Sequence, residues 1–119
     1  MGFAENFEDL QIWQRSRILT NEIYDAFKQI RDFDFRNQIQ SAAVSVMNKI
    51  SEGFEQRTKK DFAHFLDLSK GSSGEVRSML YLSEDRRYID KSAAERLRSE
   101  YKDLSKSIGA LASKLRSQQ

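Results

Sequence analysis

The sequence predicts an all-α protein that folds as one antiparallel up-down-up-down four-helix bundle over residues 1–119, and three observations carry this prediction. Proline is absent and glycine occurs five times in 119 residues, so few positions interrupt helix. Apolar residues recur at alternating spacings of four and three in four separate segments, which is the period of a helix face. Short polar stretches join these segments, and short links place successive helices antiparallel. Fraying is expected at residues 1–6 and 116–119.

The first helix is expected to begin near Asn6, whose side chain can cap a helix N-terminus, with Glu8 and Asp9 in the first turn. Its core-facing stripe is Ile12, Ser16, Leu19, Ile23, Ala26 and Ile30. One bundle core needs only a single face of this helix.

A second, aromatic-rich stripe lies beside that face. It consists of Leu10, Trp13, Tyr24 and Phe27. Either this stripe widens the surface that faces the core, or it packs against another subunit, and both interpretations stay open at this point.

The second helix follows a short connection over residues 31–34, with Asp34 placed to cap its N-terminus. Its core stripe is Phe35, Ile39, Ala42, Val46, Ile50 and Phe54. Gly53 is the strongest C-terminal signal in the chain, so we expect the helix to end near it.

The third helix is predicted to start at Thr58, which forms the [ST]-x-x-[DE] capping pattern with Asp61. Its core stripe is Phe62, Leu66, Ser69, Ser73, Val76 and Leu80. The period is unbroken across the segment Ser69 to Ser78, which is rich in glycine and serine. The sequence therefore predicts one continuous helix there and not a loop.

Small side chains in this segment would allow a close approach between helices. Gly71 and Gly74 each disfavour helix by about 1 kcal/mol relative to alanine. We expect close packing against Ala42, Ala43 and Ser45 of the second helix to offset this. A phosphate-binding loop is the alternative, but no strand precedes the segment and the motif G-x-x-x-x-G-K-[ST] is absent.

The fourth helix follows a turn over residues 86–90, and Ser92 with Glu95 forms another capping pattern. Its core stripe is Leu97, Tyr101, Leu104, Ile108, Leu111 and Leu115. This stripe is the most regular of the four.

No residue is predicted to be catalytic, to bind a cofactor or to hold a metal ion. The chain has no cysteine and one histidine, His64, which cannot supply the two Glu-x-x-His motifs of a di-iron bundle. One hypothesis is still an enzyme or metal protein centred on Asp61, His64 and Glu52, because Asp61 and His64 share one helix face. The plainer interpretation pairs His64 with Glu52 at a surface or an interface.

Asn48 and Glu52 lie four residues apart beside the core stripe of the second helix, and Glu75 lies on the third helix. Polar groups at such positions are typically half-buried and hydrogen-bonded, and they fix the register between helices. Structural or interface roles are therefore favoured over ligand binding, and no small-molecule substrate is indicated.

The C-terminal third of the chain is basic. From residue 86 to the end there are nine Lys/Arg and four Asp/Glu, a net charge of +5, whereas residues 1–85 carry a net charge of −3. The candidate nucleic-acid-binding residues are Arg86, Arg87, Lys91, Arg96, Arg98, Lys102 and Lys106. An ordinary solvated face is the alternative, since acids interrupt the run and the pI of about 8.9 is modest. Tyr88 and Tyr101 are the aromatic residues nearby, and Tyr101 belongs to the core stripe, so base stacking on it is not expected.

The mean hydropathy is −0.70, and no apolar run approaches the roughly 20 residues of a membrane span. No membrane partner is therefore expected. The absence of cysteine is typical of a reducing compartment, so the expected location is the cytoplasm.

A set of motifs runs in order along most of the chain. These are Phe7-Glu8-Asp9-Leu10-Gln11-Ile12-Trp13, Gln38-Ile39, Ala42-Ala43, Ser45, Asn48-Lys49-Ile50-Ser51-Glu52-Gly53, Arg57, Phe62, Phe65-Leu66, Lys70-Gly71-Ser72 and Glu75. Together they closely resemble the bacterial four helix bundle protein family, whose members are encoded within intervening sequences of 23S rRNA genes or elsewhere in bacterial genomes. Ser51 departs from the alanine that is commoner in that family.

The resemblance implies a four-helix fold, a homopentamer and no enzyme activity. It also makes nucleic acid a reasonable partner, because distant relatives accompany reverse transcriptases and bind nucleic acid. A ring of subunits would give the extra aromatic stripe of the first helix a surface to cover. The residues expected at the oligomer interface or in polar contacts between helices are Trp13, Tyr24, Asn48, Glu52, Phe54, Arg57, His64, Phe65 and Glu75.

The leading hypothesis is a non-enzymatic homo-oligomer that binds RNA, or DNA, through the basic face of the fourth helix. The alternative is a protein-interaction scaffold whose apolar partner surface includes Trp13, Phe54 and Phe65. The two hypotheses differ in whether charge or apolar surface holds the partner.

Overall fold

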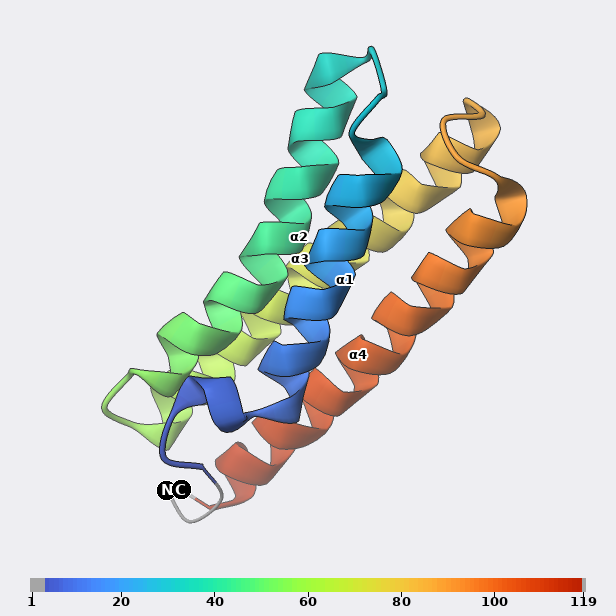
Figure 1. Cartoon of the computed structure of the whole chain (residues 1–119). Coiled ribbons are helices and arrows are strands. Elements are labelled where there is room, and N and C mark those ends of the chain that lie inside the picture. Colours follow the sequence, from blue (N-terminus) through green and yellow to red (C-terminus); the bar gives the residue numbers. More distant parts are fainter. Residues whose placement is uncertain (1–3, 119) are drawn as a thin grey trace.

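Four antiparallel helices make up the computed structural model, which describes residues 4–118 (Figure 1). A 3₁₀ turn, η1 (Phe7–Asp9), precedes α1 (Gln11–Phe27), α2 (Phe33–Phe54), α3 (Lys59–Asp85) and α4 (Lys91–Ser117). The bundle measures 46 × 19 × 19 Å. The predicted all-α bundle is confirmed. Residues 1–3 and 119, where fraying is expected, lie outside the described residues, and α4 extends to Ser117.

The core is formed by the stripes that the sequence predicts. The largest fully buried side chains are Tyr101, Phe27, Phe62, Ile23, Ile39, Ile50, Leu66, Leu80, Leu97, Leu104, Ile108 and Leu115. Four predicted core residues, Ala26, Ile30, Phe54 and Leu111, are half-buried and pack against this core. Burial of each large apolar side chain stabilises the fold by about 1.5–3 kcal/mol relative to exposure.

The pairing of helices is uneven. The contact between α3 and α4 is the most extensive, and the contact between α1 and α4 is the least extensive of the neighbouring pairs. α1 is also the shortest helix at 17 residues, whereas α3 and α4 have 27 each. α2, α3 and α4 therefore supply most of the packing in the bundle.

The first helix starts later than predicted. Asn6 caps the η1 turn instead, and its backbone N–H donates to the Asp9 carboxylate at 3.3 Å. The chain is extended at Leu10, with ψ of 126°, and α1 begins at Gln11. The break places the Leu10 side chain in the core, where it is 6% exposed.

Two other caps also differ from the predictions. Asp32, not Asp34, caps α2, and its carboxylate accepts a hydrogen bond from the Phe35 backbone N–H at 3.2 Å. α4 begins at Lys91 after Asp90, so the capping pattern at Ser92 is not used. The Asp90 side chain makes no capping hydrogen bond, so a residue of capping type near a helix start does not by itself identify the cap.

The predicted start of α3 is confirmed. The Thr58 hydroxyl accepts a hydrogen bond from the Asp61 backbone N–H at 3.0 Å. A tight α2–α3 turn precedes it, in which the Gln56 N–H bonds the Gly53 carbonyl at 3.1 Å.

α2 ends at Phe54, one residue after Gly53, so the predicted end of this helix is confirmed. Gly53 itself is helical, and a Cβ there would lie 2.7 Å from the Cβ of Phe65 and 2.9 Å from Cδ1 of Phe62. Close packing of α2 on α3 therefore requires glycine at this position.

α3 is one continuous helix through its serine-rich segment, as predicted. The buried Ser69 hydroxyl donates to the Val46 carbonyl of α2 at 2.7 Å, and the Ser45 and Ser72 hydroxyls lie 2.8 Å apart. The Ser73 hydroxyl turns to α4, 2.7 Å from that of Ser105. Serines thus join α3 to both neighbours and fix its register.

The expectation for Gly71 and Gly74 is wrong. Both are exposed, and a Cβ on either would meet no atom within 4 Å. The serines of the segment fill the contact with α2, while the two glycines lie at helix positions rotated away from it. Packing within the chain does not offset their cost.

Candidate nucleic-acid interface

Three of the seven candidate basic residues are neutralised by acids in the structure. Arg96 pairs with Glu22 of α1 at 3.0 Å, and Lys91 lies 3.9 Å from Glu95. Arg98 pairs with Glu84 of α3 at 3.0 Å, and its side chain is only 14% exposed. The predicted set is therefore not one continuous cationic surface.

Arg86 and Arg87 lie in the turn between α3 and α4, apart from the other candidates. The Tyr88 hydroxyl donates to Asp32 at 2.7 Å and anchors this turn to the start of α2. That hydrogen bond, more than the bond from the Phe35 N–H or the nearby Arg86 charge, lowers the pKa of Asp32. Arg87 has a φ of 58°, the left-handed conformation that reverses the chain here.

Cations from α3 join those of α4 on one surface. Arg98 meets Glu84 near one end of the helix pair, and Arg116 meets Asp67 near the other. Between them, Lys70 Nζ lies 3.1 Å from the position that a Cβ on Gly109 would occupy.

The Ser73 and Ser105 hydroxyls lie 2.7 Å apart. Arg77 of α3 follows Ser73 by one turn and Lys102 of α4 precedes Ser105 by about one turn, so the antiparallel register places them side by side. Lys106 follows one turn after Lys102. We call Lys70, Arg77, Lys102 and Lys106 the α3–α4 basic face.

These four cations form no ion pair with any residue among 4–118. Three acids near them in sequence are engaged by other partners: Glu84 by Arg98, Asp67 by Arg116, and Asp103 by Arg15. The Arg116 hydrogen bond is the main reason that the pKa of Asp67 lies below its ordinary value, with a smaller effect from Lys70. No ion pair within residues 4–118 therefore offsets the positive charge of the α3–α4 basic face.

Sequence reasoning missed Lys70 and Arg77, because it treated the C-terminal third as a unit. It also missed Tyr81 of α3, which is 59% exposed and lies four residues after Arg77 on the same side of the helix. The spacing from Lys70 to Arg77 to Tyr81 was a signal that could have found them. Tyr88 and Tyr101, the two tyrosines considered, are respectively hydrogen-bonded to Asp32 and fully buried.

Five of the predicted interface residues gather along α2 and α3, on what we call the α2–α3 face: Asn48, Glu52, His64, Phe65 and Glu75. The predicted pair of His64 with Glu52 is wrong, since Glu52 pairs with Lys49 at 3.0 Å. Lys49 lies one turn before Glu52 on the same helix, α2. Its Nζ also lies over the Phe65 ring, 5.8 Å from the ring centroid. The His64 ring instead meets that of Phe65, with centroids 6.1 Å apart.

Asn48, Glu52 and Glu75 are exposed and not half-buried as expected. Glu75 accepts a hydrogen bond from Gln38 of α2 at 3.4 Å. Leu68 and Leu82 lie seven residues to either side of Glu75, hence on the same stripe of α3. Their exposed fractions are 42% and 47%, so this face presents apolar as well as polar groups.

The remaining predicted interface residues are dispersed. Trp13 is half-buried against Phe7, with ring centroids 5.2 Å apart, and Phe54 packs on Phe62 at 5.9 Å. Tyr24 is 43% exposed on α1, and Arg57 is exposed in the α2–α3 turn. Of the aromatic stripe, Trp13 widens the core surface, as do Leu10 and Phe27, and only Tyr24 is largely free.

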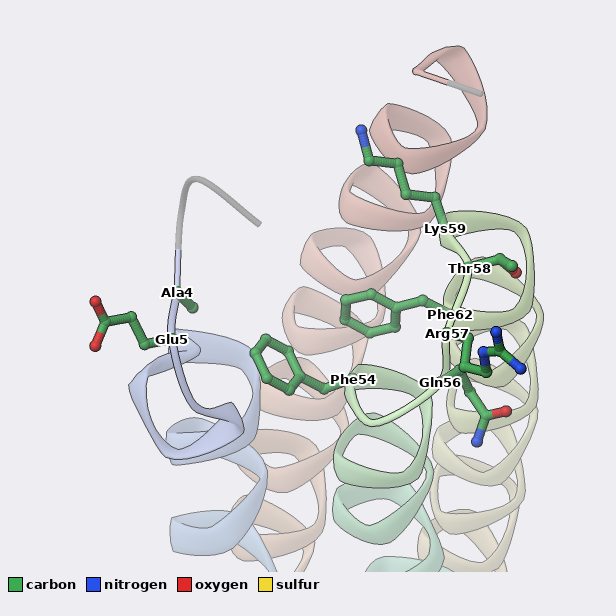
Figure 2. A pocket seen from close by; sticks show the side chains of 8 residues that line it. All are labelled: Ala4, Glu5, Phe54, Gln56, Arg57, Thr58, Lys59 and Phe62. Carbon is green, nitrogen blue, oxygen red and sulfur yellow. The ribbon is translucent and has the colours of Figure 1, made fainter.

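A surface pocket with a volume of about 520 Å³ lies at the α2–α3 turn. It is lined by Ala4, Glu5, Phe54, Gln56, Arg57, Thr58, Lys59 and Phe62. Figure 2 shows the Phe54 and Phe62 rings turned toward the segment of Ala4 and Glu5, while Arg57 extends on the other side of the turn. The Thr58 hydroxyl is engaged as the cap of α3, and the lining contains no histidine or cysteine.

Another, smaller pocket of about 270 Å³ lies between α1 and α4. Its rim carries the Arg96–Glu22 pair, together with Arg15, which bonds Asp103 at 2.8 Å. The ion pairs at this seam lie at the surface, where each contributes about 0–1 kcal/mol.

Within residues 4–118, no three His, Asp or Glu side chains are grouped so that they could hold a metal ion. Asp61, His64 and Glu52 are thus not brought together as a metal centre. None of the described helices is both long and apolar enough to cross a membrane.

Two comparisons with known proteins give matches. The sequence model of a family described as 23S rRNA-intervening sequence protein matches residues 8–110. The chain is also similar to the crystal structure of a protein with unknown function from the S23 ribosomal protein family of Bacteroides thetaiotaomicron VPI-5482. That similarity has a TM-score of 0.80 at 18% identity, and it covers 85% of this chain and 97% of the other. No curated protein matches the chain.

Proposed function

The chain belongs to the 23S rRNA-intervening sequence protein family, and from this premise we propose that it is a non-enzymatic, self-associating bundle of the cytoplasm that binds nucleic acid, RNA in particular. The proposed contact surface is the α3–α4 basic face. The Bacteroides structure of similar fold is described as being of unknown function, so the proposal depends on the chemistry of this chain.

The observation that carries the proposal is the set of unpaired cations Lys70, Arg77, Lys102 and Lys106. They line α3 and α4, the two helices with the most extensive contact. Lysine and arginine that contact phosphates release condensed counterions, and this release supplies most of the binding free energy to nucleic acid. A row of cations without internal partners is suited to that role.

Self-association is the second part of the proposal. The exposed Leu68 and Leu82 of the α2–α3 face support it, and the family resemblance implies a five-subunit ring. Several copies of a weakly binding basic face, held in one assembly, bind a long polyanion far more tightly than one copy does. A net charge of only +2 per chain is compatible with binding under these conditions.

Binding of a labelled structured RNA, measured at salt concentrations from about 50 to 200 mM, tests this function. Four phosphate contacts per chain predict that affinity falls by roughly 50-fold or more over this range, because log K falls by about 0.7–0.9 per contact and per tenfold rise in salt. The double variant Lys102→Glu, Lys106→Glu should bind weakly at every salt concentration and show a smaller salt dependence.

Lys28→Glu, Arg31→Glu is the matched control, because Lys28 and Arg31 are exposed cations at the far end of α1 and in the turn that follows it. This double variant makes the same change of charge away from the α3–α4 basic face and should leave binding nearly unchanged. Equal losses in both variants, or no binding by the wild type at low salt, would contradict the proposal. Recovery of a protein partner after nuclease treatment would then favour a protein-interaction scaffold.

A further inference from the structure

Tyr81 is the exposed aromatic side chain that continues the α3–α4 basic face. Lys70, Gly74, Arg77 and Tyr81 follow one another on α3 at spacings of four, three and four, so they form one stripe along the side of α3 next to α4. Tyr81 is 59% exposed, and Asp85 closes the stripe one turn later at the end of α3. A large apolar ring at this position is costly to hydrate and is not used by the core.

The Tyr81 ring is held in a fixed orientation. The Arg98 guanidinium lies over one ring face, 4.0 Å from its centroid. Arg98 is itself immobilised by its 3.0 Å pair with Glu84, and the side chains of both are largely buried, at 14% and 26% exposed. One face of the ring is therefore covered by a cation, and the large exposed fraction leaves the opposite face to solvent.

Gly74 widens access to this stripe. No atom lies within 4 Å of the position of a Cβ at Gly74, which stands one turn before Arg77 toward Lys70. A ligand that follows the stripe meets backbone at Gly74 and cations on either side of it. The glycine, which weakens the helix and is not needed for packing within the chain, fits a surface that an extended ligand approaches closely.

The other exposed aromatic rings among residues 4–118 lack this combination. Phe33 is stacked by Arg36 at 4.7 Å, but it stands between Asp32 and Asp34. Tyr24 lies on α1, away from the helix pair that carries the α3–α4 basic face. Tyr81 is thus the position where a preorganised ring and unpaired cations occur together.

From this geometry we propose that the α3–α4 basic face takes single-stranded nucleic acid, with one unpaired base stacked on the open face of Tyr81 and the adjoining phosphates on Arg77 and Lys102. This inference rests on the proposed function and specifies its ligand. An unpaired base offers a free π-face, whereas the bases of a duplex are already stacked on their neighbours. Cations along a helix together with an aromatic platform are how single strands are bound without sequence preference.

Fluorescence anisotropy with a labelled, unstructured 12-nucleotide RNA, its DNA counterpart and the matching RNA duplex tests the inference at low salt. The wild type should bind both single strands more tightly than the duplex. Tyr81→Ala should weaken single-strand binding by about 5- to 150-fold, the range measured for removal of a stacked aromatic residue. It should leave duplex binding within about twofold.

Tyr81→Phe is the conservative variant, and it should restore single-strand affinity because the ring is what stacks. Tyr24→Ala removes a comparably exposed tyrosine on α1 and should change nothing. Both alanine variants should fold normally, since neither side chain belongs to the core, and circular dichroism checks this.

The outcomes distinguish failure of this inference from failure of the proposed function on which it rests. If the wild type binds no nucleic acid, the proposed function fails, and the inference fails with it. If binding is lost in Lys102→Glu, Lys106→Glu but Tyr81→Ala binds like the wild type, the function stands and the stacking role is wrong. If Tyr81→Ala lowers the assembled mass in sedimentation velocity, Tyr81 is a contact between subunits, and the inference is overturned.

Discussion

Two buried hydroxyl groups in the core differ in hydrogen bonding. The Ser73 hydroxyl donates to the Tyr101 carbonyl at 3.2 Å and lies 2.7 Å from the Ser105 hydroxyl. The Tyr101 hydroxyl is fully buried and has no hydrogen-bond partner among residues 4–118, and burial is the main reason that the pKa of Tyr101 is raised. The Ser73 hydroxyl therefore stabilises the core, whereas burial of the Tyr101 hydroxyl carries a desolvation cost.

Removal of each group should therefore have opposite effects. Tyr101→Phe should leave the free energy of unfolding unchanged or raise it by up to about 1 kcal/mol, because an unsatisfied hydroxyl is lost. Ser73→Ala should lower it by about 1–3 kcal/mol, because Ser105 loses its partner. Urea unfolding followed by circular dichroism measures both, and a clear loss of stability in Tyr101→Phe would show that its hydroxyl is bonded after all, most simply to Thr20.

Asp32 links the stability of the bundle to pH. Its pKa is lowered in the folded protein from an ordinary value of 3.8, first by the Tyr88 hydroxyl and then by the Phe35 N–H. A carboxylate with a depressed folded pKa stabilises the protein above its unfolded pKa, and this contribution is lost as the pH falls through the folded pKa.

Tyr88→Phe should therefore melt at a lower temperature than the wild type at neutral pH, and the difference should narrow as the pH falls below about 4. Melting temperatures of the two proteins across that range provide the measurement. A constant difference at all pH values would mean that the ring contact of Tyr88 with Phe35, at 5.1 Å, and not the hydrogen bond, carries the effect.

At the scale of the helix, the glycines of α2 and α3 have different roles. Gly53 is enclosed by Phe62 and Phe65, whereas Gly71 and Gly74 face open space. Gly71→Ala and Gly74→Ala should each raise the free energy of unfolding by up to about 1 kcal/mol through helix propensity.

Gly53→Ala should lower the free energy of unfolding by about 1–3 kcal/mol, because the added methyl group overpacks the α2–α3 contact. Chemical unfolding of the three variants tests the contrast. A loss of stability in Gly71→Ala or Gly74→Ala would indicate that a second subunit closely approaches that glycine.

The period of the apolar residues was sufficient to predict four helices, their order and the continuity of α3, because burial of a stripe repeats at every turn. Helix ends were less predictable. Asp32 and Asp34 are both able to cap α2, and Asp32 does so, with its carboxylate also held by the Tyr88 hydroxyl from a segment distant in sequence. Of the α3–α4 basic face, Lys102 and Lys106 were predicted from the sequence and Lys70 and Arg77 were not. Ion pairs between distant segments, such as Arg96 with Glu22, decide which cations stay unpaired.

At the scale of the whole molecule, the exposed leucines of α3 predict how copies of the chain associate. Leu68→Glu with Leu82→Glu should reduce the assembled mass toward that of one 13.9 kDa chain, because charges would be buried without partners at the α2–α3 face. Helix content should be retained, since both side chains are exposed in the single chain. Light scattering after gel filtration measures the mass, with Ile18→Glu on α1 as the control, and an unchanged mass would place the subunit contact elsewhere.

The short α1, with its limited contact to α4, has a consequence for how the bundle opens. α2, α3 and α4 are joined by local turns and by buried serine bonds, whereas the α1–α4 seam depends on exposed ion pairs beside a pocket. Regions with the fewest buried contacts open with the smallest free energy. α1 should therefore be the first cooperative unit to detach, leaving a three-helix remainder that still carries the complete α3–α4 basic face, so that nucleic-acid binding and the closing of the bundle are thermodynamically separable.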